Sequence, residues 1–291
     1  MRRVLLLFML VAMAVTLFGT EAYAKVEKTS VMSFNIRIQF PADTGKFNWE
    51  SRKEGCVKAI KKYHPDILGL QEATTGQKDF MLKSLTKYIM IDGTAKPGTI
   101  NKMSEFSFNP IFFRADRFEL LDYGTFWLNE DQTPEKKGGD AEYVRSTNWV
   151  KLRFRKSGQI IFYFNTHFDN TGTKACHESS VLMVEKIKEI AGDMAVVFMS
   201  GDLNTTSENK ALKPLAAYMK ESAKTVKKAD KTPSFNDFGR KGSKPIMIDH
   251  IFYRNAQANT FKVVSENKYG IKYISDHYPV VSEFSVIIPK N

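Results

Sequence analysis

The sequence predicts an α/β fold in which two β-sheets pack together and helices cover their outer faces. Extended apolar segments outnumber helical segments by about two to one, which suits two packed sheets. The segments run strand, helix, strand, helix, several strands, and then strand–helix–strand before the closing strands. No internal repeat, low-complexity tract or linker rich in Pro, Gly or Ser interrupts them, so we expect one large domain.

The chain of 291 residues begins with a segment typical of a secretory signal peptide. Two arginines precede an apolar run at residues 4–18, and a small-x-small site follows at residues 22–24. A retained membrane anchor is the weaker alternative, because the run is shorter than the roughly 20 residues that a spanning helix needs. We expect cleavage after Ala24, export to the periplasm or the medium, and a mature domain at residues 25–291.

The net charge and the two cysteines indicate which partners and metal sites to expect. After the expected cleavage the chain keeps 41 basic and 31 acidic residues, a net charge of +10. This excess favours an anionic partner, such as a nucleic acid or an anionic phospholipid headgroup. Cys56 and Cys176 form no C-x-x-C pair, which disfavours a thiolate zinc site, and we expect both thiols to be structural and unpaired. Nothing indicates an obligate protein partner, so we expect a monomer.

The first part of the mature chain predicts two strands, each followed by a helix. Residues 31–38 form the first apolar strand, and residues 66–72 form the second. The helix between them starts at a capping box from Ser51 to Glu54 and ends before Pro65. The second helix is expected to have one apolar face, formed by Met81, Leu82, Leu85 and Tyr88. A polar loop then spans residues 92–104.

The middle of the chain predicts a run of strands. Residues 109–114 and 118–128 have the pattern of two paired strands with a turn at Asp116. A long polar loop follows at residues 131–140. Further apolar strands are expected at residues 149–154 and 159–164.

The last third begins with a helix whose apolar face includes Val184, Ile187 and Ala191. It leads into a buried strand at residues 195–199, and Ser207 is expected to cap the next helix. Residues 220–231 carry five lysines and have the composition of a solvated surface. Strands at residues 246–253 and 278–281 close the chain.

Polar side chains stand at or beside the ends of six predicted strands. In AVVFMSGDLNT at residues 195–205, Asp202 and Asn204 are two apart, so both should face one way while Leu203 faces the protein. His167 and Asp169 repeat this spacing. Turns and helix caps use the same residue types, but their repetition at several strand ends indicates convergence at one rim. The residues at these ends are Asn35, Glu72, His167, Asp202, Asn204, Asp249, Asp276 and His277.

These residue types favour phosphoryl chemistry at a hard metal ion. Carboxylates at Glu72, Asp202 and Asp276 are oxygen ligands that suit Mg²⁺, Mn²⁺ or Ca²⁺ better than zinc. Amides at Asn35 and Asn204 add further oxygen donors. A divalent cation on a basic scaffold, with a histidine nearby, fits transfer of a phosphoryl group to water. No GxSxG motif and no P-loop are present.

Six motifs together resemble the endonuclease/exonuclease/phosphatase superfamily. They are FNIR at 34–37, LQE at 70–72, THFD at 166–169, SGDLN at 200–204, IDHIF at 248–252 and SDHYPV at 275–280. They follow the superfamily order and span residues 31–284. The superfamily includes DNase I-like nucleases, AP endonucleases, poly(A) deadenylases, inositol-polyphosphate 5-phosphatases and bacterial sphingomyelinases. The resemblance implies a DNase I-like, four-layer α/β/β/α sandwich of two mixed sheets.

The resemblance also implies a role for each matching residue. Glu72 would be the principal ligand of Mg²⁺, with Asn35 and Asp276 assisting directly or through water. Asp202 would orient or deprotonate the attacking water. Asp249 would orient His277 through a hydrogen bond. The phosphate would be held by His277, Asn204 and His167, and, on a weaker match, by Arg145.

The sequence departs from the superfamily pattern at a few positions. Arg37 stands where AP endonucleases carry a metal-binding acid, and His250 stands where an aromatic residue is common. The core catalytic residues are all present, which disfavours an inactive binding module with the same fold. We therefore expect an exported, divalent-metal-dependent phosphoesterase that attacks a phosphodiester or phosphomonoester with activated water. A secreted nuclease and a sphingomyelinase-like lipid phosphodiesterase both remain open as specific activities.

Overall fold

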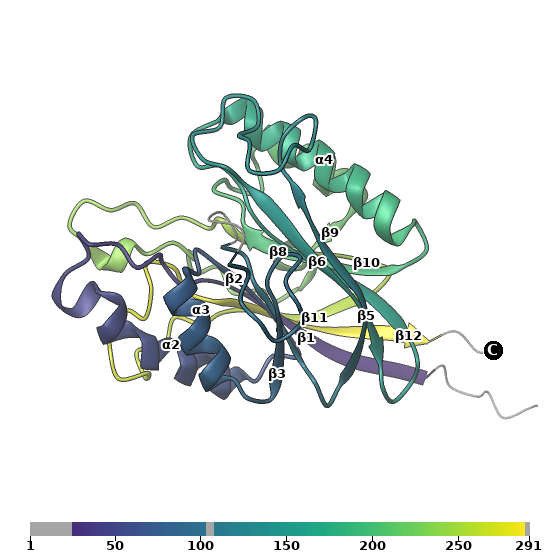
Figure 1. Cartoon of the computed structure of the whole chain (residues 1–291), viewed down its shortest axis with the longest axis horizontal. Helices are drawn as coiled ribbons and strands as arrows, with labels where there is room; N and C mark the ends of the chain where they lie inside the picture. The colour runs from purple at the N-terminus through teal and green to yellow at the C-terminus, as the bar shows by residue number, and fades with distance from the viewer. Residues whose placement is uncertain (1–24, 103–107, 289–291) are drawn as a thin grey trace, which may run out of the picture.

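The computed structural model describes residues 25–102 and 108–288, so the expected signal peptide at residues 1–24 lies outside them. Two mixed sheets of six strands each pack face to face, and helices cover the outer side of each sheet (Figure 1). This confirms the predicted α/β sandwich. Within the described ranges, no helix has both the length and the apolar character needed to cross a membrane.

The first sheet contains the N- and C-terminal strands. Its order is β11 (Gln257–Val263), β12 (Val280–Ile288), β1 (Lys25–Asn35), β2 (Ile67–Gln71), β4 (Ile111–Arg114) and β3 (Tyr88–Ile91). β1 and β2 are parallel, and the other neighbours are antiparallel. Helices α2 (Trp49–Tyr63) and α3 (Thr75–Ser84) pack on its outer face through an apolar cluster that includes Ile60 and Met81.

The second sheet has the order β5 (Phe118–Trp127), β6 (Ser146–Phe154), β7 (Ile160–His167), β8 (Val196–Asp202), β10 (Asp249–Arg254) and β9 (Lys220–Glu221). β7 and β8 are parallel, and α4 (Thr173–Ala191) connects them. α4 and α5 (Lys213–Tyr218) cover the outer face. Shorter helices are η1 (Gly45–Phe47), η2 (Lys210–Leu212), α6 (Ser222–Thr225) and η3 (Asp237–Gly239).

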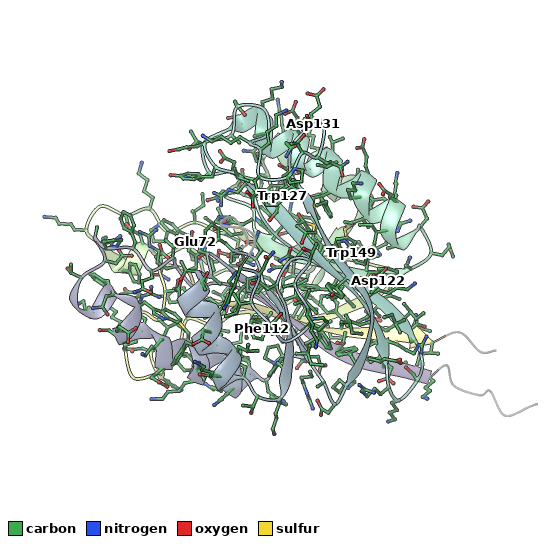
Figure 2. All side chains as sticks on the ribbon, viewed as in Figure 1. Glu72, Phe112, Asp122, Trp127, Asp131 and Trp149 are labelled. Carbon is green, nitrogen blue, oxygen red and sulfur yellow. The ribbon has the colours of Figure 1, made fainter. Side chains whose placement is uncertain are left out.

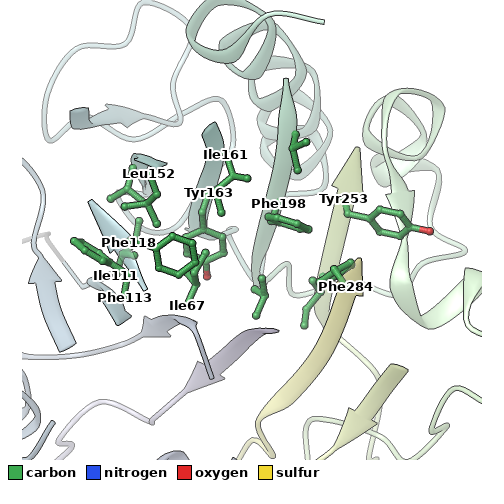
Figure 3. Packing of buried hydrophobic residues seen from close by; sticks show 14 of the residues in the cluster. Ile67, Ile111, Phe113, Phe118, Leu152, Ile161, Tyr163, Phe198, Tyr253 and Phe284 are labelled. Atoms are coloured by element: carbon green, nitrogen blue, oxygen red, sulfur yellow. The ribbon is translucent and has the colours of Figure 1, made fainter. Parts of the chain in front are cut away.

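Alternation along each strand builds three apolar layers. In β8, Phe198 packs between the sheets, whereas Met199 packs toward α4. Figure 3 shows Ile67 of the first sheet beside Tyr163 of the second, and Phe284 of the first sheet beside Phe198 of the second. The sheets approach closely at Gly69, where an added Cβ would clash with the Tyr163 hydroxyl and the Asn165 side chain. A larger residue there would force the sheets apart.

The topology brings the polar strand ends to one rim. The parallel strands of each sheet end side by side, so Asn35 and Gln71 are register partners, as are His167 and Asp202. β10 is antiparallel to β8 and begins with Asp249 opposite Asp202. β12 likewise begins opposite the end of β1, which brings residues 275–277 to the same rim.

Two predicted helix starts are wrong. α2 begins at Trp49, because the Asn48 side chain accepts the Ser51 backbone N–H, and the Ser51 hydroxyl donates to the Gly45 carbonyl instead of capping. Ser207 caps no helix: its hydroxyl donates to Glu221, while Asn209 accepts the Ala211 N–H at the start of η2. In both cases a nearby asparagine caps the helix instead of the predicted serine, because several residues at a helix start can have suitable side chains.

Two strand assignments also need correction. Tyr88 begins β3 and lies outside α3, which ends at Ser84. Residues 109–114 and 118–128 do not pair with each other: β4 pairs with β2 and β3, whereas β5 pairs with β6 in the other sheet. The turn near Asp116 therefore carries the chain from one sheet to the other, and Phe113 and Phe118 share the core between the sheets.

The expectations for the two cysteines, for the lysine-rich segment and for Leu203 agree with the structure. Cys56 and Cys176 are both buried and free. The five lysines of residues 220–231 are exposed, and Leu203 faces the core beneath α4.

Candidate functional site

A pocket of about 730 Å³ opens where the rims of the two sheets meet. Glu72 lies between the part of the molecule that carries α2 and α3 and the part that carries α4 (Figure 2). Seven of the nine predicted site residues line the pocket: Glu72, Arg145, His167, Asp202, Asn204, Asp276 and His277. The other two, Asn35 and Asp249, are buried directly behind them and form hydrogen bonds to lining residues.

Asn35 links the ends of three strands. Its Nδ2 donates to Glu72 Oε1 and to Asp202 Oδ2, both at 3.0 Å, and its Oδ1 accepts the Arg37 backbone N–H at 3.0 Å. The Ile38 N–H donates to Glu72 Oε2 at 2.8 Å. Asn35 therefore presents its nitrogen to the two carboxylates and holds carboxylates from different sheets in a fixed relation.

Three site residues have left-handed backbone. The φ angles of Arg37, Glu72 and Asn204 are 58°, 60° and 52°. Such a conformation costs about 1–3 kcal/mol in a residue other than glycine, and it concentrates at functional sites. All three side chains line the pocket, so the strained backbone directs them toward a common space.

His277 forms a buried pair with Asp249. Its Nδ1 lies 2.7 Å from Asp249 Oδ2, so the ring donates there and Nε2 is left facing Asp202 Oδ2 at 3.6 Å. Burial alone would lower the pKa of His277, but Asp249, Asp202 and Asp276 together raise it well above its usual value. The arrangement fits an imidazolium that is oriented by Asp249 and donates into the pocket.

His167 has the opposite electrostatic surroundings. Arg145 Nη1 lies 2.9 Å from its Nδ1, and a guanidinium only donates, so Nδ1 accepts and the ring proton is on Nε2. Burial, Arg145 and His277 lower the pKa of His167 well below its usual value. Nε2 faces Asp202 Oδ2 at 3.4 Å, while the neighbouring Asn204 Nδ2, itself a donor, gives its hydrogen bond to the Phe168 carbonyl. His167 is therefore a neutral hydrogen-bond donor, suited to hold an oxygen.

Asp169 does not join His167 in the pocket, contrary to its spacing. Its carboxylate turns toward the adjoining loops and accepts four backbone N–H groups at 2.7–3.1 Å, from Glu142, Tyr143, Thr171 and Gly172. The chain leaves strand geometry after His167, so the two-residue alternation ends there. Asp169 instead fixes the loop that carries Arg145, whose Nε lies 3.9 Å from Asp169 Oδ2.

Sequence reasoning missed the site residues that come from loops. Arg37, Asp237 and Arg240 line the pocket, and Asp43 connects two of them from behind. No strand end or motif marks Asp43 and Arg240, which are 197 residues apart in the chain. The departure from the superfamily pattern at Arg37, the last residue of the FNIR motif, was the one available signal.

His250 also has a structural role that the sequence did not indicate. Its Nε2 lies 2.8 Å from the Thr205 carbonyl, and its Nδ1 lies 2.8 Å from Glu221 Oε1. Because the carbonyl only accepts, Nε2 donates to it. His250 thus holds the turn that follows Asp202 and Asn204.

The pocket floor fits a hard divalent cation. Glu72, Asp202 and Asp276 bring three carboxylates to this pocket. Possible ligand atoms of Asp202, Asp249 and His277 also lie within 4.8 Å of one another, but His277 and Asp249 are already paired with each other. Burial raises the pKa of Asp202 to about 7, opposed by His277 and reinforced by Asp249. Burial also raises the pKa of Asp276, opposed by His277 and reinforced by Glu72. A cation would compensate this concentration of negative charge.

Comparison with known proteins places this geometry in a family. Residues 32–277 match the profile of the Endonuclease/Exonuclease/phosphatase family. The solved endonuclease/exonuclease/phosphatase from Bacteroides vulgatus is 30% identical, with a TM-score of 0.79, covering 89% of this chain and 98% of that one. The mannosyl-6-phosphatase from Bacteroides thetaiotaomicron is 27% identical, with a TM-score of 0.76, covering 88% of this chain and 99% of that one.

A curated but uncharacterized protein of Acanthamoeba polyphaga mimivirus is 26% identical over 235 residues. The alignment covers 70% of this chain but only 34% of that relative, so the chain spans about a third of its length. The family match, by contrast, extends from β1 to the Asp276–His277 pair and includes every predicted site residue. The chain therefore belongs to the Endonuclease/Exonuclease/phosphatase family.

Proposed function

We propose that this chain is an exported, divalent-metal-dependent phosphatase that hydrolyses a phosphomonoester by direct attack of an activated water. The charge of the pocket lining is the main support for a monoester. Four carboxylates and three guanidinium groups line it, and there is no lysine among the described lining residues. The charged residues are Arg37, Glu72, Arg145, Asp202, Asp237, Arg240 and Asp276.

Each arginine of the lining already has a polar or charged partner. Arg37 pairs with Asp43, Arg240 pairs with Asp43 and Asp237, and Arg145 contacts His167. A polynucleotide would need an unpaired basic track along its backbone. The net charge of +10 is thus not concentrated at the pocket, which favours one phosphoryl group over a polyanion. The similarity to a mannosyl-6-phosphatase supports a sugar phosphate as the first substrate class to test.

The proposed mechanism assigns each residue to one function. The metal, held by Glu72 and Asp276 with Asn35 behind them, would supply Lewis-acid neutralisation of phosphoryl charge. Asp202 would orient the attacking water and accept its proton. His277, oriented by Asp249, would donate to the charge that develops on the phosphoryl oxygens.

Two neutral donors would complete the phosphoryl site. His167 Nε2 lies 3.4 Å from Asp202 Oδ2, and Asn204 Nδ2 lies 3.0 Å from His167 Nε2, so both side chains stand beside Asp202, where each would hold a phosphoryl oxygen. Arg145 acts through His167, because its guanidinium fixes the ring proton on Nε2.

Hydrolysis of phosphate esters by residues 25–291 tests the proposal, measured as phosphate release from monoesters and as formation of cleaved product from diesters. The purified protein, with Mg²⁺ or Mn²⁺, is assayed against mannose 6-phosphate, p-nitrophenyl phosphate, single-stranded DNA, RNA and sphingomyelin. We expect turnover of the monoesters, loss of turnover in excess EDTA, and an inactive Asp202→Asn control. Preferential cleavage of nucleic acid or sphingomyelin, or full activity in EDTA, would contradict the proposal.

Export and oligomeric state are separate parts of the proposal. The predicted signal peptide supports a mature chain that begins at Lys25, and N-terminal sequencing of protein from the native host tests this. A retained Met1 would exclude cleavage. All proposed catalytic residues come from one chain, which supports an active monomer.

A further inference from the structure

One side of the pocket is formed by residues that the proposed chemistry does not use. We define the Asp237 wall as Phe40, Phe235, Asp237, Arg240 and Ile246, all of which line the pocket. Phe40 and Ile246 are 50% and 40% exposed, and they are among only six large hydrophobic residues exposed in the described chain. Apolar side chains left exposed within a polar cavity mark a place for a ligand.

A chain of buried and half-buried charges makes this wall rigid. Asp43 Oδ2 accepts from Arg37 Nε, and Asp43 Oδ1 accepts from Arg240 Nη2, both at 2.9 Å. Arg240 Nη1 then donates to Asp237 Oδ1 at 2.9 Å. The guanidinium of Arg240 also lies over the Phe238 ring, 5.1 Å from its centroid. The segment after β1 is thereby fixed to the segment before β10.

Three of the same residues, which line the pocket, have polar atoms without a hydrogen-bond partner in the described part of the chain. Asp237 Oδ2 and Arg240 Nε have no hydrogen-bond partner among the described residues. Nη1 and Nη2 of Arg37 likewise have no acceptor there. An acceptor and several donors therefore stand beside an apolar surface, next to the site where the phosphoryl group is expected.

The wall adjoins the reacting centre. The Phe235 ring packs edge-on against His277, with centroids 5.1 Å apart, and the Phe235 backbone forms a bridge to His277. A group attached to the phosphoryl centre through an ester oxygen would reach Asp237 and Arg240 from there.

We propose that the Asp237 wall binds the alcohol part of the substrate, and that this alcohol is neutral and rich in hydroxyl groups, as in a sugar. This inference rests on the proposed phosphomonoesterase function. The linked charges at the wall cancel, because they are two arginines and two aspartates: Arg37, Arg240, Asp43 and Asp237. The wall therefore offers little attraction to a second anion. Adjacent carboxylate and guanidinium groups match neighbouring hydroxyls, which both donate and accept. The apolar members would pack against the C–H face of a ring.

Two substrates with different alcohols separate this role from a structural one. We compare mannose 6-phosphate with p-nitrophenyl phosphate, whose leaving group carries no hydroxyls, for Asp237→Asn and Phe40→Ala. Each variant is expected to lower kcat/KM for mannose 6-phosphate by about 10- to 100-fold, mainly through KM, because a site built for hydroxyls depends on those contacts. For p-nitrophenyl phosphate the change should stay within about 3-fold. Asp131→Asn removes an exposed carboxylate outside the pocket and serves as the control.

The outcomes distinguish failure of the proposed role of the Asp237 wall from failure of the proposed phosphatase function. Equal losses on both substrates, or no loss on either, would overturn the inference while leaving the phosphatase proposal intact. If the wild type hydrolysed p-nitrophenyl phosphate but no sugar phosphate, the inference would also be overturned and the phosphatase proposal would stand. Failure of the wild type on every monoester would instead overturn the proposed function, and the inference with it. Circular dichroism melts confirm that the variants are folded.

Discussion

At the residue scale, the site depends on a single oxygen, Asp202 Oδ2. Asn35 donates to it at 3.0 Å, while Nε2 of His167 and Nε2 of His277 lie 3.4 and 3.6 Å away. Burial and an arginine lower the pKa of His167 and keep it neutral, whereas the neighbouring carboxylates raise the pKa of His277 and keep it charged despite its burial. Two imidazoles of opposite charge state thus face one carboxylate, which gives the pocket one base and two distinct donors.

This geometry predicts that Asp202 and His277 act as one unit. Asp202→Asn and His277→Ala should each lower kcat on a phosphomonoester by about 10²–10⁴-fold, the range of acid–base and oxyanion groups. The double variant should be far less than additive, because either loss removes the same transition state. Asp249→Asn should have a milder effect, since it acts through His277. Wild-type turnover in folded His277→Ala would exclude this assignment.

The sequence predicted the site residues at strand ends but did not predict the site residues in loops. Asn35, Glu72 and Asp202 follow buried strands, so alternation and topology together predict where their side chains meet. Asp43 and Arg240 meet only because two long loops fold over the rim, and no local pattern encodes that contact. Motif resemblance therefore predicted the residues expected to perform the chemistry and missed the wall beside them.

At the element scale, the same limit explains the errors in strand pairing. Periodicity predicted strands at residues 109–114 and 118–128, and the structure forms them at residues 111–114 and 118–127. Pairing, however, depends on packing against distant elements. A short turn between two apolar strands usually predicts a hairpin. Here Phe113 and Phe118 gain burial in the space between the sheets, so the chain crosses instead of folding back.

The Asp169 carboxylate joins two loops to the start of α4 through hydrogen bonds. Burial alone would raise its pKa, but four backbone N–H groups hold the pKa below its usual value. Because the folded-state pKa is depressed, the carboxylate stabilises the fold above the unfolded pKa of about 3.9, and that stability is lost as pH falls through the folded pKa. Asp169→Asn should thus cost about 1–3 kcal/mol at pH 7.

Urea unfolding at several pH values checks this expectation. The difference in unfolding free energy between wild type and Asp169→Asn should be largest above about pH 5 and should shrink toward pH 3. Asp131→Asn, at an exposed pair with Lys136, should change little. A difference that stayed constant with pH would show that the Asp169 charge contributes nothing.

At the scale of the whole molecule, buried polar groups fix the two sheets against each other. Gln71 Nε2 donates to Asn165 Oδ1 at 2.8 Å, and Asn165 Nδ2 donates to the Leu70 carbonyl at 2.8 Å. These bonds join β2 to β7 directly beneath the rim. The carboxylates of the pocket are therefore held close by the sandwich itself, and they cannot separate to relieve their repulsion while the protein is folded.

A metal that binds this preorganised cluster should raise the stability of the whole fold. The unfolded chain separates Glu72, Asp202 and Asp276, so a cation binds the folded state preferentially. At 100 times the dissociation constant, Mg²⁺ or Mn²⁺ should add about 2.7 kcal/mol, which corresponds to a rise in Tm of about 5–10 °C for a domain of this size. Excess EDTA should reverse the rise. The Glu72→Gln substitution removes one charge from the cluster and keeps the size of the side chain. The metal-dependent rise in Tm should be much smaller in this variant than in wild type. Its Tm without metal should be equal or higher, because carboxylate repulsion is relieved. An equal rise in both proteins would place the cation elsewhere on the surface, and no rise in either would exclude a metal site at this rim.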